Sequence, residues 1–206
     1  MLNEITRALR PALVLLLLLA MVTGLAFPAL VTGIAQIAMP AQANGSLIRD
    51  GERVIGSDLI AQGFASPRYF QPRPSAAGQG YDASASAATN LAPGSRDLRD
   101  AIAGRVAEAR AGGLTQASVP PDLVTTSASG LDPDLSPEAA LAQVARVARA
   151  RGLPEASVRA LVVRSIAHPL FGIIGERRVN VLRLNRRLDL EPLDRQFQGI
   201  APNPAQ

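Results

Sequence analysis

The chain has 206 residues, enough for one domain or for a domain with an appendage. It contains no Cys and a single His, His168, which excludes disulfides, thiolate metal sites, cysteine nucleophiles and histidine-based zinc sites. The 21 basic residues are all Arg, against 17 acidic residues, so the net charge is +4 and lysine chemistry is excluded. The arginines are spread rather than clustered, which argues against a nucleic-acid-binding protein.

The segment 11–38 is apolar throughout and is predicted to be a transmembrane helix. No charged residue occurs between Arg10 and Arg49. Roughly 20 apolar residues cross the hydrocarbon core of a bilayer, so this segment is long enough to span it with some tilt. Pro28 lies in mid-span and has no backbone N–H, so we expect a kink that a neighbouring helix could offset.

A cleaved signal peptide is the alternative to a retained anchor. The string Ala41-Gln42-Ala43 fits a signal-peptidase site. The apolar run, however, is about twice the length of a signal-peptide core, which is roughly 7–15 residues. Its length therefore favours an anchor that stays in the protein.

The basic residues around the span indicate its orientation. Arg7, Arg10 and the terminal amine precede the span, and two arginines follow it closely. The positive-inside rule then favours a cytoplasmic N-terminus, in keeping with a short stub before a long C-terminal domain. We predict a cytoplasmic stub at 1–10 and an extracytoplasmic domain at 39–194, outside the inner membrane.

The first part of the domain is predicted to be a hairpin followed by a long irregular stretch. Asp50-Gly51 lies between two short apolar runs within 47–55, which is a typical hairpin turn. Residues 63–95 are rich in Gly, Pro, Ser and Ala, and so long a loop is either functional or disordered. The aromatic residues near its edges argue against plain disorder.

Helix start and stop signals recur in the remaining chain. Ser95 can cap a first helix, and Ser136-Pro137-Glu138 combines a cap, a proline in the first turn and an acid near the positive end of the dipole. The segment 179–184 is a strand candidate, and the polar tail 195–206 is expected to be flexible. The predicted helices cover 96–111, 137–151 and 155–167.

These elements predict an α+β fold. One N-terminal transmembrane helix is followed by a single small extracytoplasmic domain with about three helices. The hairpin and the strand at 179 are expected to form a small sheet. The order of its strands is not readable from the pattern.

Patterns typical of enzymes are scarce. A Ser-His-Asp triad would require His168, but this residue precedes Pro169 at a predicted helix end, where a capping or surface histidine is the better interpretation. Asp132-Pro133-Asp134 could hold a cation, although turn-forming carboxylates before the next helix are favoured. No catalytic and no metal-binding set is therefore predicted.

Two further sets of residues could bind an anion or a partner. The small, hydroxyl-rich segment 84–90 could cradle a phosphate through its backbone N–H groups, but loop packing is the simpler interpretation. The arginines are predicted to be solvated helix and turn charges, with contact to lipid headgroups or a partner as the alternative: Arg146, Arg149, Arg151, Arg186 and Arg187. The residues alone thus indicate a single-span anchor with a small domain, a subunit of something larger.

The order and spacing of several short motifs go further and resemble the KdpC family of potassium-transporting ATPase subunits. The resemblance runs from the anchor to about residue 189. Each motif is weak alone, but their order and spacing make the match specific. The motifs lie at 56–62, 69–76, 86–91, 119–125, 127–133, 136–140, 146–148, 179–182, 184–185 and 188–189.

This resemblance implies a non-catalytic accessory subunit of an ATP-driven, high-affinity potassium uptake complex, with no cofactor of its own. The implied partners are a channel-like potassium-selecting subunit, a P-type ATPase subunit, a small single-span subunit and membrane lipid. In the family this subunit serves assembly and has been proposed to raise the ATP affinity of the ATPase subunit. The implied nucleotide-binding residues are Ser86, Thr89 and Asn90.

The nucleotide role conflicts with two observations. The family segment usually reads S-G-G-S-N, and here both glycines are replaced, by Ala87 and Ala88, which disfavours a cradle that needs positive φ angles. ATP is also cytoplasmic, whereas the predicted orientation puts this loop outside. We therefore favour a brace on the outer face that stabilises the assembly or shapes ion access. The alternative is a free-standing, membrane-anchored binding or hydrolytic protein.

Overall fold

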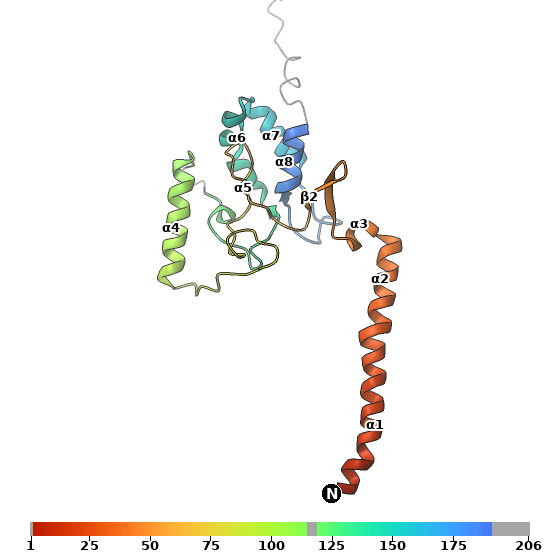
Figure 1. Ribbon diagram of the computed structural model, residues 1–206. Helices are drawn as coiled ribbons and strands as arrows, with labels where there is room; N and C mark the ends of the chain where they lie inside the picture. Colours follow the sequence, from red (N-terminus) through yellow and green to blue (C-terminus); the bar gives the residue numbers. More distant parts are fainter. Residues whose placement is uncertain (1, 115–118, 191–206) are drawn as a thin grey trace, which may run out of the picture. The chain divides into compact units, whose positions relative to one another are not determined.

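The computed structural model describes residues 2–114 and 119–190, and the predicted tail at 195–206 lies outside them. The chain divides into two compact units, the first ending at Leu47 and the second beginning at Ile48 (Figure 1). The first is the anchor unit and the second is the soluble domain, and each is described by itself.

The anchor unit is almost entirely helical. Its candidate membrane span is Arg7–Ala38, in which an 18-residue window has a mean hydropathy of 2.6 and is not buried within the chain. This helix is long and apolar enough to cross a bilayer. Its parts are α1 (Leu2–Met21), a π-helical turn η1 (Val22–Ala26), α2 (Phe27–Ala38) and a short α3 (Pro40–Ala43).

The π-helical turn lies immediately before Pro28. Within it the Phe27 N–H donates to the Val22 carbonyl, one residue further back than in an α-helix. The Thr23 hydroxyl donates to the Leu19 carbonyl at 2.7 Å. An α-helix would lose one backbone hydrogen bond at Pro28, which has no N–H. The wider π-helical turn shifts the hydrogen-bond pattern at this point, so the chain adapts to the proline without a neighbouring helix.

The soluble domain begins with the predicted hairpin. Strands β1 (Leu47–Asp50) and β2 (Arg53–Ser57) form a sheet of two strands. Gly51 at the turn has φ +58°, a conformation that Gly adopts without steric cost. The D-G signal thus located the hairpin correctly.

The helices of the domain follow the predicted pattern with one break. The Ser95 hydroxyl accepts the Leu98 N–H at 3.2 Å and begins the first helix. The single helix expected at 137–151 is wrong: Gln143, with φ −86° and ψ −10°, separates two helices. The helices are α4 (Arg96–Ala111), the 3-10 turn η3 (Pro121–Leu123), α5 (Pro137–Ala142), α6 (Val144–Arg151) and α7 (Glu155–Arg164).

The strand expected at 179–184 is mostly a helix. Only β4 (Val179–Asn180) is extended, and it pairs antiparallel with β3 (Asp134–Leu135). The helix α8 (Val181–Leu190) follows directly, with the Asn180 side chain accepting the Arg183 N–H at 3.0 Å. The expected single sheet is therefore two separate sheets, while the α+β class is confirmed.

The core lies where α5, α6, α7 and α8 pack together, as the grouped helices in Figure 1 show. The irregular segment before α4 contributes Phe70, whose side chain is completely buried. The main buried side chains from the helices are Ala139, Ala140, Val144, Val147, Val158, Leu161, Val162, Val181, Leu184 and Leu188.

Candidate functional site

Two buried amides hold the backbone of Phe70 and Gln71 against the helical core. Asn185 on α8 accepts the Phe70 N–H at 2.8 Å and donates to the Phe70 carbonyl at 2.9 Å. Gln143 accepts the Gln71 N–H at 2.8 Å and donates to the Gln71 carbonyl at 2.9 Å. Each amide satisfies the donor and acceptor of one residue, as a neighbouring strand would. We call this arrangement the amide clamp.

Arginines from α6 bind the backbone next to the clamp. Arg146 donates to the Pro67 carbonyl at 2.7 Å and to the Tyr69 carbonyl at 3.1 Å. Burial lowers the pKa of the Arg146 guanidinium. The prediction of a solvated charge is wrong here, because α6 directs this side chain onto the carbonyls of Pro67 and Tyr69. Arg149, one turn away, is exposed as predicted.

Arg151 links the same segment to the end of α8. Its Nε donates to the Arg68 carbonyl at 2.8 Å, and its guanidinium pairs with Asp189 at 2.7 Å. The guanidinium also lies 4.8 Å from the centre of the Tyr69 ring, and the Tyr69 hydroxyl donates to Asp189. With 8% of its side chain exposed, Arg151 is not the solvated charge that we predicted.

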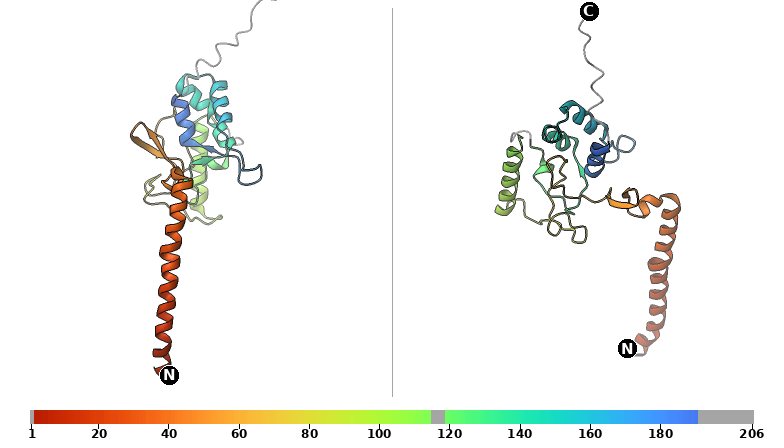
Figure 2. Two further views of the ribbon diagram at one scale, coloured as in Figure 1. Left: turned by 90° about the vertical axis from the view of Figure 1, so that its right-hand side faces the viewer. Right: turned by 45° about the horizontal axis from the view of Figure 1, so that its top comes forward.

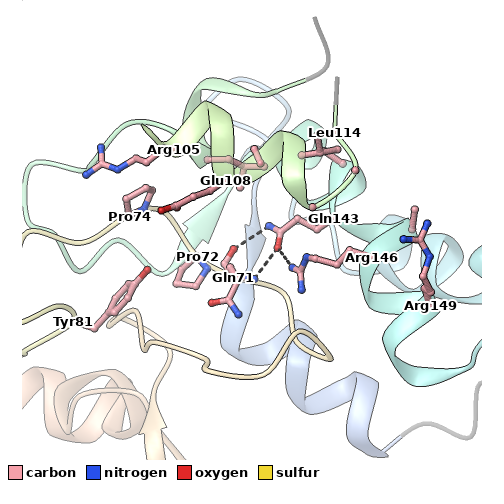
Figure 3. A pocket seen from close by; sticks show the side chains of 16 residues that line it. Gln71, Pro72, Pro74, Tyr81, Arg105, Glu108, Leu114, Gln143, Arg146 and Arg149 are labelled. Atoms are coloured by element: carbon pink, nitrogen blue, oxygen red, sulfur yellow. Dashed lines mark hydrogen bonds between the residues drawn. The ribbon is translucent and has the colours of Figure 1, made fainter. Parts of the chain in front are cut away.

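A cavity of about 370 Å³ adjoins the amide clamp on the side of α4 (Figure 3). Arg105 at its edge donates to the Val124 carbonyl at 3.0 Å. The Tyr81 hydroxyl donates to the Arg73 carbonyl at 2.9 Å, and burial raises its pKa. Its lining combines apolar side chains with three arginines and one glutamate. Its main lining residues are Pro72, Pro74, Tyr81, Arg105, Glu108, Leu123, Ala142, Arg146 and Arg149.

Asp132 and Asp134, for which a cation site was the less favoured interpretation, lie in a turn bound by arginines. Asp132 accepts the Asp134 N–H at 3.0 Å, which forms the turn, and pairs with Arg73 at 3.4 Å. Asp134 pairs with Arg178 at 3.0 Å, and burial raises its pKa. No group of three or more potential metal-binding side chains occurs in 2–114 or 119–190. The side chains of Asp132 and Asp134 are engaged in the turn and in ion pairs with arginines.

The segment implied to bind nucleotide lies in one exposed loop. The Ser86 hydroxyl donates to the Ser129 carbonyl at 2.9 Å, and Thr89 and Asn90 are exposed. None of the three lines the cavity beside the clamp. Asn90 has φ +52°, so one residue of the segment does adopt the left-handed conformation. The loop brings the three residues into one stretch of surface but buries none of their side chains.

The remaining residues from the sequence analysis are either exposed on the surface or hydrogen-bonded to neighbouring segments. His168 is exposed in the loop after α7, as a surface histidine would be. Arg186 donates to the Arg49 carbonyl at 2.8 Å and Arg187 to the Ser165 hydroxyl at 3.2 Å. Sequence reasoning overlooked Gln143 and Asn185. Their signal was a polar amide at a position where the helical period requires an apolar residue.

Comparison with known proteins shows which family the chain is similar to. The family model for KdpC, described as K+-transporting ATPase, c chain, matches residues 9–190. A relative from Caulobacter vibrioides strain NA1000, a potassium-transporting ATPase KdpC subunit, is 54% identical over 194 residues, covering 93% of this chain and 98% of the relative.

Two further relatives carry the same name. That from Gemmatimonas aurantiaca is 53% identical over 182 residues, covering 88% of this chain and 92% of the relative. That from Rhodospirillum rubrum is 53% identical over 184 residues, covering 89% and 95%. With matches of this extent and identity, the chain belongs to the KdpC family and is an accessory subunit of a K+-transporting ATPase complex.

Proposed function

We propose that this chain is a non-catalytic, single-pass subunit that braces the outer face of the potassium-transporting complex. The anchor helix supports this proposal most directly, because its apolar surface is wholly exposed in the isolated chain. In this proposal residues 1–10 are cytoplasmic, and the domain at 39–194 lies outside the inner membrane, where it stabilises the assembly and shapes ion access.

The proposed partners follow from the two exposed surfaces. The anchor helix contacts lipid and the membrane segments of a channel-like potassium-selecting subunit. The domain contacts the outer parts of the same assembly, which also contains a P-type ATPase subunit and a small single-span subunit. Gly24 and Gly33 lie on a surface that no other part of the chain covers, and without a side chain they let a partner helix approach closely.

Purification tests whether the chain acts within a complex. A mild detergent extract of cells that express the whole operon with a tag on this chain should yield it in stoichiometric association with two larger membrane subunits. An isolated monomer with a binding or hydrolytic activity of its own would support the free-standing alternative instead.

Single cysteines test the orientation, since the chain has none of its own. Ala83→Cys places a thiol on an exposed loop of the domain, and Glu4→Cys places one in the N-terminal stub. In intact spheroplasts a membrane-impermeant maleimide should label Ala83→Cys alone, and Glu4→Cys should react only after lysis. The reverse pattern would refute the proposed orientation and revive a nucleotide role.

An effect on ATP affinity would require the loop that carries Ser86, Thr89 and Asn90 to face nucleotide. The loop's exposure is the observation in favour of such a contact. The triple alanine variant should leave the KM for ATP of the purified complex unchanged if the domain is a brace. A KM raised several-fold, with the complex intact, would instead support the nucleotide role.

A further inference from the structure

The chain between α7 and α8 forms an arm that projects from the body of the domain in both views of Figure 2. Antiparallel bridges between Ala167 and Arg178 and between Leu170 and Ile174 hold it as a narrow hairpin. Its tip offers on the order of 500 Å² of apolar surface, as much as the largest patch on a typical soluble monomer. The exposed tip residues are Leu170 (61%), Phe171 (84%), Ile173 (83%) and Ile174 (61%).

Most backbone N–H groups of this tip donate to carbonyls within the arm. The N–H of Leu170 donates to the Ile174 carbonyl at 2.9 Å, and that of Ile174 to the Leu170 carbonyl at 3.0 Å. The N–H groups of Gly172 and Ile173 donate to the carbonyls of Pro169 and Leu170. Hydrocarbon offers no partner to a backbone polar group, so only a self-paired segment enters it at low cost. In the tip, four backbone N–H groups already have a hydrogen-bond acceptor within the arm and would not need one from the lipid.

The side chains around the tip suit an anionic lipid surface. From residue 170 to residue 175 the sequence is Leu-Phe-Gly-Ile-Ile-Gly, without a polar side chain. At the base of the arm, Arg177 and Arg178 are exposed beside the single acid Glu176, and Arg178 also pairs with Asp134. Arginines beside an apolar wedge can lay their stems along it while their heads contact phosphates.

The tether keeps the domain close to a bilayer. The candidate span ends at Ala38 and the compact domain begins at Ile48. Ten residues reach at most about 35 Å when fully extended. The tether therefore keeps the domain at the membrane that holds the anchor, at an effective concentration that makes even a weak contact with lipid significant.

We propose that the tip at residues 170–174 inserts into the interfacial layer of the membrane as a second, shallow anchor beside the helix. Protein interfaces combine apolar contacts with hydrogen-bonding side chains. This tip has none, so its chemistry favours acyl chains over a protein partner. The inference rests on the proposed membrane anchoring. A shallow contact would limit how far the domain tilts on its tether.

A tryptophan reporter tests this proposal cleanly, because the chain has no Trp. The full chain carrying Phe171→Trp is reconstituted alone into vesicles of phosphatidylcholine and phosphatidylglycerol, with plain or dibrominated acyl chains. Insertion to roughly 5–10 Å should shift the emission to the blue and give at least about twofold quenching by the brominated lipid. The matched control is Ala107→Trp, exposed on α4 at the other side of the domain in Figure 1, which should stay unquenched.

The other outcomes each overturn the proposal in a distinct way. Flotation of the wild-type chain with the vesicles tests the anchor separately, and a chain that does not float refutes both the anchoring and the tip contact. If the chain floats and Phe171→Trp is not quenched, the tip proposal alone fails. An emission that shifts to the blue only when the other subunits are added, without quenching by brominated lipid, would identify the tip as a protein-docking site instead.

Discussion

At the scale of single residues, Asn185 is expected to matter most for stability. It is 2% exposed and supplies both hydrogen bonds of the Phe70 backbone. Asn185→Leu fills a similar volume but leaves a buried N–H and a buried carbonyl unpaired, so the free energy of unfolding should fall by about 3 kcal/mol. Urea unfolding of the full chain in detergent, followed by circular dichroism, measures this loss.

The control for this change lies on the same helix. Leu190 is 69% exposed, so Leu190→Ala should change the free energy of unfolding by less than about 0.5 kcal/mol. If Asn185→Leu proved as mild as this control, the amide clamp would contribute little, and Phe70 would be held by packing alone.

Gly130 should not tolerate a side chain. It has φ +67°, and a Cβ there would lie 2.7 Å from the Ala87 carbonyl oxygen and 2.8 Å from the Ala77 nitrogen. Both neighbours are backbone atoms that cannot rotate away, so Gly130→Ala should lower the melting temperature and cost more than about 1 kcal/mol. At Gly94, a Cβ would meet nothing within 4 Å, and Gly94→Ala should melt as the wild type does.

Asp134 should make the protein less stable as the pH rises. Burial raises the pKa of its carboxyl above the ordinary 3.8, so the native state binds more protons than the unfolded state around that pH. The contribution of this group to stability is therefore lost as pH rises through its folded pKa. Relative to the wild type, Asp134→Asn should gain stability between acid and neutral pH, in urea titrations at several pH values. A difference that does not change with pH would contradict this.

At the scale of elements, α6 helps to order the irregular segment 63–75 beside the amide clamp. Arg146 binds two of its carbonyls, and no helix or strand of its own stabilises it. Arg146→Met retains the side-chain volume but removes these charge-assisted bonds, at a cost of roughly 2–3 kcal/mol. Limited digestion with chymotrypsin should then cut after Tyr69 and Phe70 faster than in the wild type.

Arg149→Met is the matched control for the digestion. Arg149 lies on the exposed side of the same helix, so its loss should leave the cleavage rate unchanged. Equal protection of both variants would mean that the amide clamp alone orders the segment.

At the scale of the whole molecule, the two units are expected to fold independently. The chain divides compactly after Leu47, and the buried core belongs entirely to the second unit. A chain that begins at Asn44 should therefore unfold cooperatively, with a free energy within about 1 kcal/mol of that of the full chain. It should also leave the membrane fraction. A truncated domain that does not fold would show that its stability depends on the anchor.

The sequence alone was sufficient to predict features that depend on interactions between residues close together in the chain. The long apolar helix before Arg49, the hairpin at Asp50-Gly51 and the cap at Ser95 were all identified correctly, because hydropathy, a glycine turn and a capping hydroxyl act over a few residues. The order and spacing of short motifs also sufficed to recognise the family.

Only the tertiary structure decided which polar side chains are buried and what they bind. Gln143 breaks a helix and Asn185 lies in the core because each meets the backbone of a segment more than 70 residues away. Residues 181–184 belong to the strand candidate at 179–184, yet they form a helix because Leu184 and Leu188 pack on one face against α7. Contacts between segments distant in sequence leave no local pattern, so the amide clamp and the apolar arm could be found only in three dimensions.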